Sequence, residues 1–424
     1  MRAYQVYIEL QGKQVRVGEI RGNTSEDARF SYAAEYLSEN HSGAFSVSLP
    51  LQTEPFSPER TRCFFEGLLP EGFMRRIIAS NMRLEENDYL SILYNLGREC
   101  LGAVRIDDAD GEPESGYEAL TSKQVEELAA EGTVKSSEMV IKTHLSLTGA
   151  SGKVGLYYDE KNDRWYLPYG LAPGTHIVKQ SHIRLDGIVT NEQLSMLAAR
   201  KCGIETPESF IINVGKGTDA EVLFATERYD RIIDETSEMI CGLKRPHRIH
   251  QEDFAQAMGI ASGEKYEKDG QNHAEKMFEL IRNHCANPLE DQLRLWNRIV
   301  YHYALGNTDA HIKNHALLYD SRMKEIRLAP AYDMISTAIY ESATREMSFH
   351  IGGTRDLDKI DEECFKSLAA GAGIGEKTAM NHYRGVLDRF ENAIREAGKE
   401  LQETGFAHAG AIAERILLAR KKIL

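Results

Sequence analysis

The stretch Gly306-Asn307-Thr308-Asp309-Ala310-His311-Ile312-Lys313-Asn314 decides the fold that we predict for this sequence. Its aspartate, Asp309, precedes Asn314 by five residues, and a second aspartate, Asp333, follows nineteen residues after Asn314. Kinases arrange their catalytic groups in this order, because phosphoryl transfer needs a carboxylate to orient the attacking hydroxyl and oxygen ligands to hold Mg²⁺. We therefore predict that Asp309 is the catalytic residue and that Asn314 and Asp333 bind magnesium.

This spacing alone is a weak signal, because a glycine and an aspartate also end helices and form turns in unrelated proteins. Two features earlier in the chain favour the kinase interpretation. A glycine-containing loop lies between two expected strands, and Lys179 ends the apolar strand 175–179. Glycines let backbone N–H groups approach phosphate, and a lysine at the end of a buried strand needs an anionic partner. We expect Glu192, early in the next helix, to be that partner.

The glycine-containing loop consists of Thr148, Gly149, Ala150, Ser151, Gly152 and Lys153. It is not a Walker A motif, because Leu147 stands in place of the first glycine and Val154 follows the lysine, so a plain hairpin turn remains an alternative. Further along, Glu227, Arg228 and Tyr229 follow a strand at the place where a kinase hinge offers backbone groups to adenine. We also expect His311 and Lys313 to contact phosphate.

The composition is that of an ordinary globular protein. The chain has 424 residues, 42% of them hydrophobic, and at about 100–200 residues per domain this length predicts two or three core-forming units. The formal net charge of -14 argues against binding of nucleic acid through the overall charge, although a local basic patch remains open. The short basic run 244–248 is followed by two acidic residues, so we interpret it as a solvated loop.

Targeting signals are not evident in the sequence. The first residues alternate apolar and polar side chains, unlike a signal peptide, and no run approaches the roughly 18 apolar residues of a membrane helix. The six cysteines are scattered and include no Cys-x-x-Cys pair. We predict reduced thiols in a cytoplasmic protein that has no membrane association.

Apolar periodicity predicts an α+β fold. We expect a hairpin over residues 4–17 with its turn at Gln11-Gly12, a mostly helical stretch from 56 to 103, and an acidic linker over 107–116. We then expect a helix over 122–131, strands over 138–147, 153–158, 165–167 and 175–179, a helix over 191–202 ended by Gly203, strands over 209–214 and 221–226, a helix over 291–305, and a hairpin over 316–328.

The sequence resembles the HipA serine/threonine kinases, the toxins of bacterial toxin–antitoxin modules. The similarity covers nearly the whole chain and rests on many motifs in order. These are Phe64-Phe65-Glu66-Gly67-Leu68-Leu69-Pro70, Leu96-Gly97-Arg98-Glu99-Cys100-Leu101-Gly102-Ala103-Val104, Leu145-Ser146-Leu147-Thr148-Gly149-Ala150, Thr175-His176-Ile177-Val178-Lys179, Glu227-Arg228-Tyr229-Asp230-Arg231, His250-Gln251-Glu252-Asp253-Phe254, Asn307 to Asn314, and Leu328-Ala329-Pro330-Ala331-Tyr332-Asp333.

The resemblance implies a protein-kinase-like, bilobal fold related to lipid kinases. It implies an N-terminal accessory subdomain over 1–106, a mixed kinase N-lobe over 107–235 and a mostly helical C-lobe over 236–424. It further implies ATP and Mg²⁺ as cofactors. The residues that it implies for the nucleotide site are Thr148, Gly149, Ala150, Ser151, Gly152, Lys153, Lys179, Glu227, Arg228, Tyr229, His311, Ile312, Lys313, Asn314, Tyr332 and Asp333, with Asp309 catalytic.

Autophosphorylation at Ser146 is also implied, because Ser146 matches the serine at which family members modify themselves. The added charge of roughly −2 beside a phosphate-binding loop opposes nucleotide binding. The sequence departs from the family at Ser151-Gly152, where Gln and then an acidic residue or Pro are usual. This departure predicts a more flexible loop and a second phosphoacceptor, Ser151.

Three functions follow as hypotheses. The first is a kinase toxin that phosphorylates a translation component, such as an aminoacyl-tRNA synthetase. A small helix-turn-helix antitoxin similar to HipB would neutralise it. The toxin would contact DNA only indirectly, through this antitoxin. The second is a nucleotide-binding co-repressor that acts mainly within an antitoxin–DNA complex. The third is a small-molecule kinase, against which Asn307-Thr308-Asp309 in place of His-Gly-Asp and the extended N-terminal part both count.

Overall fold

The computed structural model describes residues 2–38, 43–107, 114–143, 152–181 and 185–421. The chain divides into two compact units, and each unit is built from three separate stretches. The first unit comprises Met1–Gln180, Ala225–Ser262 and Leu317–Ile326, and the second comprises Ser181–Phe224, Gly263–Ala316 and Arg327–Leu424. The predicted boundaries at 106 and 235 stay a prediction.

A four-stranded antiparallel sheet opens the first unit. Its strands β1 (Arg2–Leu10), β2 (Lys13–Gly22), β3 (Arg29–Tyr32) and β4 (Val104–Asp107) lie in the order β3-β2-β1-β4. Gln11 and Gly12 both have positive φ angles, 50° and 78°, as a two-residue hairpin turn requires, and Leu10 pairs with Lys13. The predicted hairpin is confirmed.

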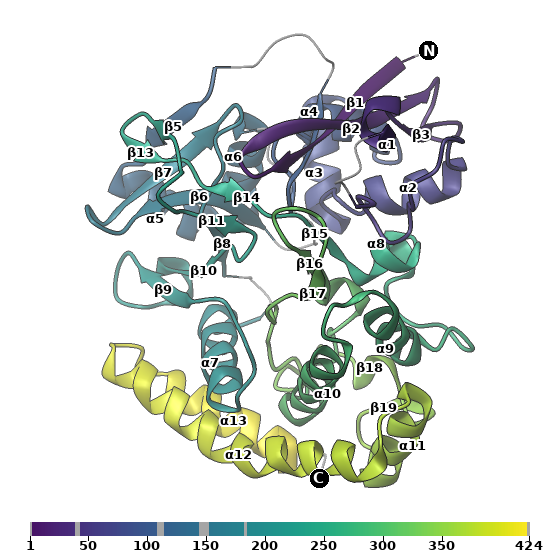
Figure 1. Cartoon of the computed structure of the whole chain (residues 1–424). Coiled ribbons are helices and arrows are strands. Elements are labelled where there is room, and N and C mark those ends of the chain that lie inside the picture. Colours follow the sequence, from purple (N-terminus) through teal and green to yellow (C-terminus); the bar gives the residue numbers. More distant parts are fainter. Residues whose placement is uncertain (1, 39–42, 108–113, 144–151, 182–184, 422–424) are drawn as a thin grey trace. The chain divides into compact units, whose positions relative to one another are not determined.

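Short helices accompany this sheet in the first unit. They are α1 (Ala34–Ser38), α2 (Pro58–Glu66), α3 (Gly72–Met82) and α4 (Tyr89–Leu96), so the helical prediction for 56–103 is confirmed (Figure 1). Five phenylalanine rings, those of Phe30, Phe45, Phe56, Phe64 and Phe65, are almost completely buried and pack on one another. They form the aromatic core of this part of the unit.

Four further strands of the first unit lie in the order β5-β7-β6-β8. Their bounds are Gly116–Ala119 for β5, Lys153–Asp159 for β6, Arg164–Tyr169 for β7 and His176–Gln180 for β8. The expected strands over 153–158, 165–167 and 175–179 are therefore confirmed, as is the expected helix α5 (Ser122–Glu131).

The prediction of a strand over 138–147 is wrong for the residues of this range that the structure describes. Residues 138–143 belong to helix α6 (Thr133–Thr143). The side chains that this helix buries are Ser136, Ser137, Met139 and Val140, which follow the helical spacing of one, three and four residues and not the alternation of a strand. The remaining predicted residues, 144–147, lie outside the described part of the chain.

The rest of the first unit consists of short strands and one helix. They are β11 (Arg231–Ile232), β12 (Met239–Ile240), β13 (Leu243–Lys244), β14 (His247–Arg248), β15 (Gln251–Asp253) and α8 (Phe254–Met258). Strand β15 pairs with β16 (Ala316–Tyr319), which pairs with β17 (Ile326–Leu328), and this hairpin is the one predicted over 316–328.

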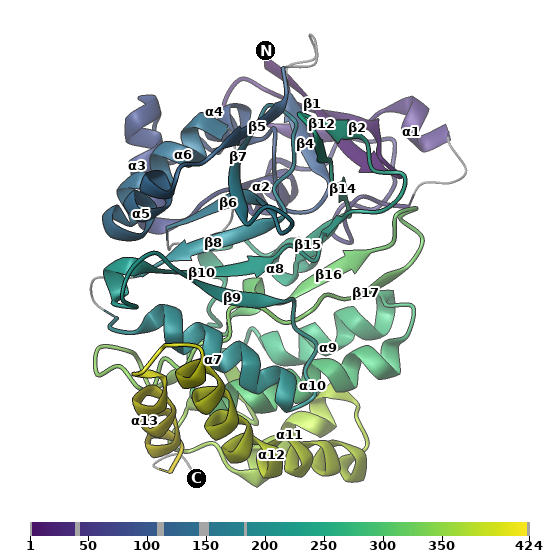
Figure 2. The ribbon, with the colours of Figure 1, turned by 90° about the vertical axis from the view of Figure 1, so that its left-hand side faces the viewer.

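Helices dominate the second unit. Its elements are α7 (Ile188–Lys201), β9 (Ser209–Asn213), η1 (Asp219–Glu221), the start of β10 (Val222–Glu227), η2 (Ser262–Glu264), α9 (His273–His284), α10 (Pro288–Leu305), η3 (Ile312–Asn314), β18 (Glu346–Ile351), β19 (Thr354–Asp356), α11 (Glu362–Ala372), α12 (Glu376–Glu403) and α13 (Ala409–Lys421). Helices α7, α10 and α13 all pack against the long helix α12 (Figure 2).

The predicted helices over 191–202 and 291–305 are confirmed as α7 and α10. The fully buried Trp296 of α10 packs against Phe278 of α9 and Phe365 of α11. None of the helices in the described ranges is long and apolar enough to cross a membrane. All six cysteines lie within these ranges, and they form no disulfide with one another. The observed mixture of sheets and helices agrees with the predicted α+β class.

Candidate active site

The predicted catalytic segment begins where helix α10 ends. Gly306 takes a positive φ of 66°, and its N–H donates to the carbonyls of His302 and Tyr303, which closes the helix. The next residues are fixed by hydrogen bonds within the second unit. The N–H of Thr308 donates to Thr337 Oγ1 at 2.8 Å, and Ser348 Oγ donates to the carbonyl of Thr308 at 2.9 Å. Asp309 follows as an exposed residue on this fixed backbone.

Asn314 is tied directly to the backbone of Asp309. Its amide Nδ2 donates to the carbonyl of Asp309 at 2.9 Å, and the residue is only 7% exposed. Because the nitrogen of the amide is engaged by the backbone, the oxygen is the atom that can ligate a cation. The five-residue spacing thus has a structural reason, which is a one-turn loop closed by this hydrogen bond.

Asp333 is joined to the same loop through the buried residue Asn307. Asn307 Nδ2 lies 3.1 Å from the carbonyl of Asp333, to which it donates, and 3.1 Å from His302 Nδ1. Asp333 itself has a φ of 54°, which is a strained conformation for a residue other than glycine. The loop therefore holds Asp333 in an orientation that an unconstrained chain would avoid, and strain of this kind is typical of functional sites.

The donor set fits magnesium. A carboxylate from Asp333 and an amide oxygen from Asn314 are hard oxygen ligands, and Mg²⁺ is commonly held by one or two protein oxygens together with phosphate and water. No cluster of three or more His, Cys, Asp or Glu side chains suited to a metal occurs in the described ranges. A cation at this loop would accordingly depend on phosphate oxygens for part of its coordination.

The other residues predicted in this segment are mostly buried. His311, Lys313 and Ile312 are 6%, 6% and 0% exposed, so Ile312 offers only its backbone. The hydroxyl of Tyr332 donates to the carbonyl of Lys313 at 2.9 Å and so connects the Asp333 segment to the loop a second time. Burial lowers the pKa of His302, behind the loop, to about 3, so this imidazole is neutral at physiological pH.

Two residues that hold parts of this candidate site were not predicted from the sequence. Tyr266 donates a hydrogen bond from its hydroxyl to Asp309 Oδ1 at 2.5 Å. Asn191 of α7 is completely buried, and its amide donates to the carbonyl of Ser336 at 2.9 Å while its oxygen accepts from the N–H of Ser336 at 3.1 Å. Asn191 thus fixes the segment that follows Asp333, and no local sequence signal marks either residue.

In the first unit, the two predicted phosphate-binding lysines are cross-strand partners. Lys153 of β6 pairs with Lys179 of β8, and paired residues of antiparallel strands project from the same face of the sheet. This pairing places the two predicted lysines on neighbouring strands at the end of the predicted loop.

Gly152 has a packing role at the end of this loop. A Cβ atom on Gly152 would lie 1.9 Å from Gln180 Nε2, which itself donates to Ser136 Oγ at 3.0 Å. The chain therefore passes close to a buried side chain at Gly152, and the more flexible loop that the sequence predicts stays a prediction. The candidates Ser146, Thr148, Gly149, Ala150 and Ser151 lie outside the described residues.

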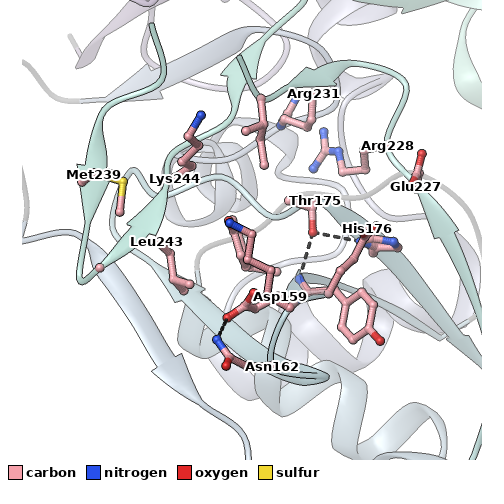
Figure 3. A pocket seen from close by; sticks show the side chains of 16 residues that line it. Asp159, Asn162, Thr175, His176, Glu227, Arg228, Arg231, Met239, Leu243 and Lys244 are labelled. Atoms are coloured by element: carbon pink, nitrogen blue, oxygen red, sulfur yellow. Dashed lines mark hydrogen bonds between the residues drawn. The ribbon is translucent and has the colours of Figure 1, made fainter. Parts of the chain in front are cut away.

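The predicted hinge residues follow strand β10 in the first unit. The N–H of Arg228 donates to the carbonyl of Thr175 at 2.8 Å, and Thr175 Oγ1 accepts from the N–H of Tyr158 at 2.9 Å. Figure 3 shows Thr175 and Arg228 beside a cavity of about 570 Å³, with Thr175 hydrogen-bonded to His176. The start of the hinge segment is thus attached to the strand that carries Lys179.

The side chain of Arg228 belongs to a buried cluster of charges. Arg228, Arg231 and Arg248 face the carboxylates of Glu9, Glu99 and Asp230, and all six side chains are at most 3% exposed. The distances include 2.7 Å for Arg231 to Glu99, 2.8 Å for Arg228 to Asp230 and 3.0 Å for Arg248 to Glu9. We call this group the charge cluster.

The charge cluster corrects the interpretation of the basic run 244–248. Arg248 is buried in the cluster and Arg245 pairs with Glu9 at its edge, so these two residues do not form a solvated loop. Burial alone would raise the pKa of Glu9, but the hydrogen bond from Arg245 and the charges of Arg248 and Arg245 outweigh it and hold that pKa at about 2. The cluster joins strand β1 to the segment that follows the hinge.

The predicted ion pair between Lys179 and Glu192 stays a prediction, because Lys179 belongs to the first unit and Glu192 to the second. Glu192 is 3% exposed within α7, so its carboxylate is not the solvated acid of an ordinary helix start.

Comparison with known proteins connects these features to a family. The model of the HipA N-terminal domain matches residues 8–107, and the model of the HipA-like C-terminal domain matches residues 145–394, which is more than half of the chain. The chain belongs to the HipA family. This assignment confirms the resemblance that the sequence motifs carry.

Relatives and a solved structure agree with membership of the HipA family. The protein Y4mE of Sinorhizobium fredii is 30% identical over 388 residues, which cover 89% of this chain and 88% of that protein. The serine/threonine-protein kinase toxin HipA of Shewanella oneidensis is 22% identical over 404 residues, 92% of this chain and 88% of that protein.

A solved structure of the Shewanella oneidensis MR-1 toxin–antitoxin system with HipA, HipB and operator DNA matches with a TM-score of 0.78 and 20% identity. The match covers 98% of this chain and 97% of that one. This match confirms the predicted protein-kinase-like α+β fold. Membership of the HipA family supports a kinase function for the chain.

Proposed function

We propose that this HipA-family chain is an ATP-dependent serine/threonine protein kinase that acts as the toxin of a toxin–antitoxin module. The observation that carries the proposal is the arrangement of Asp309, Asn314 and Asp333 around one loop, in which Asn314 bonds to the backbone of Asp309 and Asn307 bonds to the backbone of Asp333. A carboxylate for the acceptor hydroxyl and two oxygen ligands for a cation are the groups that phosphoryl transfer requires.

In this reaction Asp309 orients the acceptor hydroxyl and takes its proton. The acceptor oxygen forms a bond to the γ-phosphorus of ATP, the bond from that phosphorus to the bridging oxygen breaks, and ADP leaves with the electron pair. Magnesium, when bound by Asn314 and Asp333, neutralises phosphate charge. The nucleotide-binding residues that we propose are Thr148, Gly149, Ala150, Ser151, Gly152, Lys153, Lys179, Glu227, Arg228, Tyr229, His311, Ile312, Lys313, Asn314, Tyr332 and Asp333.

The arrangement of these residues supports the assignment in each unit separately. Lys153 and Lys179 are paired residues of β6 and β8 in the first unit, and the N–H of Arg228 is hydrogen-bonded to the carbonyl of Thr175, just before β8. The side chain of Arg228 is used by the charge cluster, so its proposed contact with nucleotide is through the backbone.

The proposal includes partners and regulation. A small helix-turn-helix antitoxin similar to HipB would bind the chain and supply the contacts to DNA, by analogy with the matched Shewanella complex of HipA, HipB and operator DNA. The protein substrate would be a translation component such as an aminoacyl-tRNA synthetase, in the cytoplasm. Autophosphorylation of Ser146 would switch the kinase off, and we retain the division into 1–106, 107–235 and 236–424 as part of this proposal.

The test compares the purified chain with two variants in the presence of Mg-ATP and cell lysate. Asp309→Asn removes the proposed base and is expected to lower phosphate transfer by about 10²- to 10⁴-fold. Asp269→Asn is the matched control, because Asp269 is exposed in the same unit and is expected to leave transfer unchanged. Mapping of phosphosites by mass spectrometry also tests Ser146 and identifies the substrate.

Transfer that survives in Asp309→Asn would contradict the proposed catalytic role. Binding of Mg-ATP by the wild type without transfer to itself or to any lysate protein would favour the co-repressor hypothesis instead.

A further inference from the structure

A cavity of about 470 Å³ opens beside Asp309 in the second unit. Fourteen residues line it, and seven of them are apolar or aromatic, including Ile335, Tyr340, Ala343 and Met347. The fold makes this wall from the segment that follows Asp333 and from the start of β18. The cavity is large enough for part of a peptide, since small-ligand sites are commonly about 300–1,000 Å³.

A hydroxyl already occupies the position next to the proposed base. Tyr266 OH donates to Asp309 Oδ1 at 2.5 Å, and both residues line the cavity. An alcohol that donates to this carboxylate makes the contact that a substrate serine or threonine must make before it loses its proton. The phenolic oxygen of Tyr266 therefore marks where an acceptor hydroxyl binds.

Tyr266 is placed where an incoming segment can displace it. Its side chain is 44% exposed, and its ring is held by an edge-on contact with His311, at 5.3 Å between centroids, and by Lys265, whose Nζ lies 5.5 Å from the ring centre. Both are single, weak ring contacts, so an acceptor that gains the carboxylate and the apolar part of the wall can replace the tyrosine.

The charges at the rim favour an uncharged neighbour for the acceptor. Arg355 Nη2 lies 3.0 Å from Glu346 Oε2, so these two lining residues neutralise each other. This neutralised pair offers little compensation for a buried carboxylate of the peptide. An aliphatic side chain gains from burial against Ile335 and Met347, whereas an acidic one would lose its hydration there.

We propose that this cavity is the acceptor subsite of the kinase. It binds a serine or threonine hydroxyl at Asp309 and an aliphatic side chain from the neighbouring residue of the peptide. Tyr266 occupies the acceptor position until the peptide displaces the tyrosine. The proposal rests on the proposed kinase function.

The experiment uses two synthetic peptides that differ only beside a single serine, one with leucine on both sides and one with glutamate on both sides. The wild-type chain is expected to phosphorylate the leucine peptide with at least a 10-fold higher kcat/KM. Ala343→Glu, which places a carboxylate in the wall, is expected to lower kcat/KM for the leucine peptide at least 10-fold and to leave the KM for ATP unchanged. Ala370→Glu, at an exposed position of α11 that does not line the cavity, is expected to behave as the wild type.

The hydroxyl of Tyr266 is tested by Tyr266→Phe. We expect the KM for the leucine peptide to fall about 3-fold with kcat changed less than 2-fold, because the competing hydroxyl is gone, whereas a merely structural role would lower kcat and leave KM unchanged or raise it.

Equal use of the two peptides, or transfer to lysate proteins with transfer to neither peptide, would overturn the subsite. An Ala343→Glu variant that retains wild-type kcat/KM would overturn it as well. Absence of transfer to peptides, to lysate and to the chain itself is a different result, which refutes the kinase function and not the subsite alone.

Discussion

Replacement of Glu9 by glutamine tests the charge cluster most directly. Glu9 is 2% exposed, accepts hydrogen bonds from the N–H of Arg248 at 2.9 Å and from the guanidinium of Arg248 at 3.0 Å, and pairs with Arg245. Its pKa is lowered from 4.5 to about 2. A shift of this size corresponds to about 3 kcal/mol of folding stability at pH 7, which Glu9→Gln is expected to remove.

The pH dependence has a definite sign. Because the pKa of Glu9 is lower in the folded chain, its contribution is complete above pH 4.5 and declines as the pH falls toward 2. The difference in the free energy of unfolding between wild type and Glu9→Gln is therefore expected to shrink from about 3 kcal/mol at pH 7 to about 1 kcal/mol at pH 3.

The two tryptophans allow each unit to be measured separately. Trp165 lies in β7 of the first unit and Trp296 in α10 of the second, so urea unfolding in a Trp296→Phe background reports the first unit through Trp165 fluorescence. Glu118→Gln is the matched control, because its ion pair with Lys142 is exposed and contributes less than about 1 kcal/mol. A Glu9→Gln variant as stable as this control at pH 7, or a difference that does not change with pH, would refute the reasoning.

Three further predictions concern packing, a buried amide and a buried acid. Gly152→Ala should destabilise the first unit by about 1–3 kcal/mol in the same fluorescence assay, because the added Cβ would lie 1.9 Å from Gln180. Addition of Gln180→Ala should restore most of the lost stability. If the double variant is as unstable as Gly152→Ala, this packing explanation is wrong. Asn191→Ala should destabilise the second unit by about 2–4 kcal/mol, measured by Trp296 fluorescence in a Trp165→Phe background, since it leaves the backbone N–H and C=O of Ser336 without the Asn191 amide; an unchanged unfolding midpoint would count against it. Burial raises the pKa of Glu252 from 4.5 to about 7, so the contribution of Glu252 to folding stability is present below pH 4.5 and lost as the pH rises through 7. Glu252→Gln should therefore match the stability of the wild type at pH 4 but be more stable by up to about 3 kcal/mol at pH 8. Equal stability of the two proteins at both pH values would refute this.

Local signals in the sequence predicted the parts of the fold that depend on neighbouring residues. The hairpin turn at Gln11-Gly12 and the end of α10 at Gly306 each need a positive φ, and glycine at these places is visible in the sequence. The sequence also showed the five-residue spacing from Asp309 to Asn314, and the structure adds the hydrogen bond that joins the two residues.

Features that depend on distant residues were not predictable in this way. The run 138–143 contains apolar residues that suit a strand or a helix, and the preceding serines, which are buried at helical spacing, give no warning because serine is usually exposed. Tyr266 meets Asp309 across 43 positions of the sequence, and Arg248 meets Glu9 across 239. One sequence cannot show that such residues are partners, so their roles follow only from the structure.

The charge cluster also has a consequence for synthesis on the ribosome. The arginines that neutralise Glu9 are added 236 and 239 residues after it. At roughly 5–20 residues per second, translation needs on the order of 10–50 s to reach them. During that interval the sheet of strands β1 to β3 holds a carboxylate that cannot be buried without its cations, so the native packing of β1 has to wait until the segment after the hinge has emerged. A nascent chain interrupted before residue 245 would lack the charges that complete its first unit.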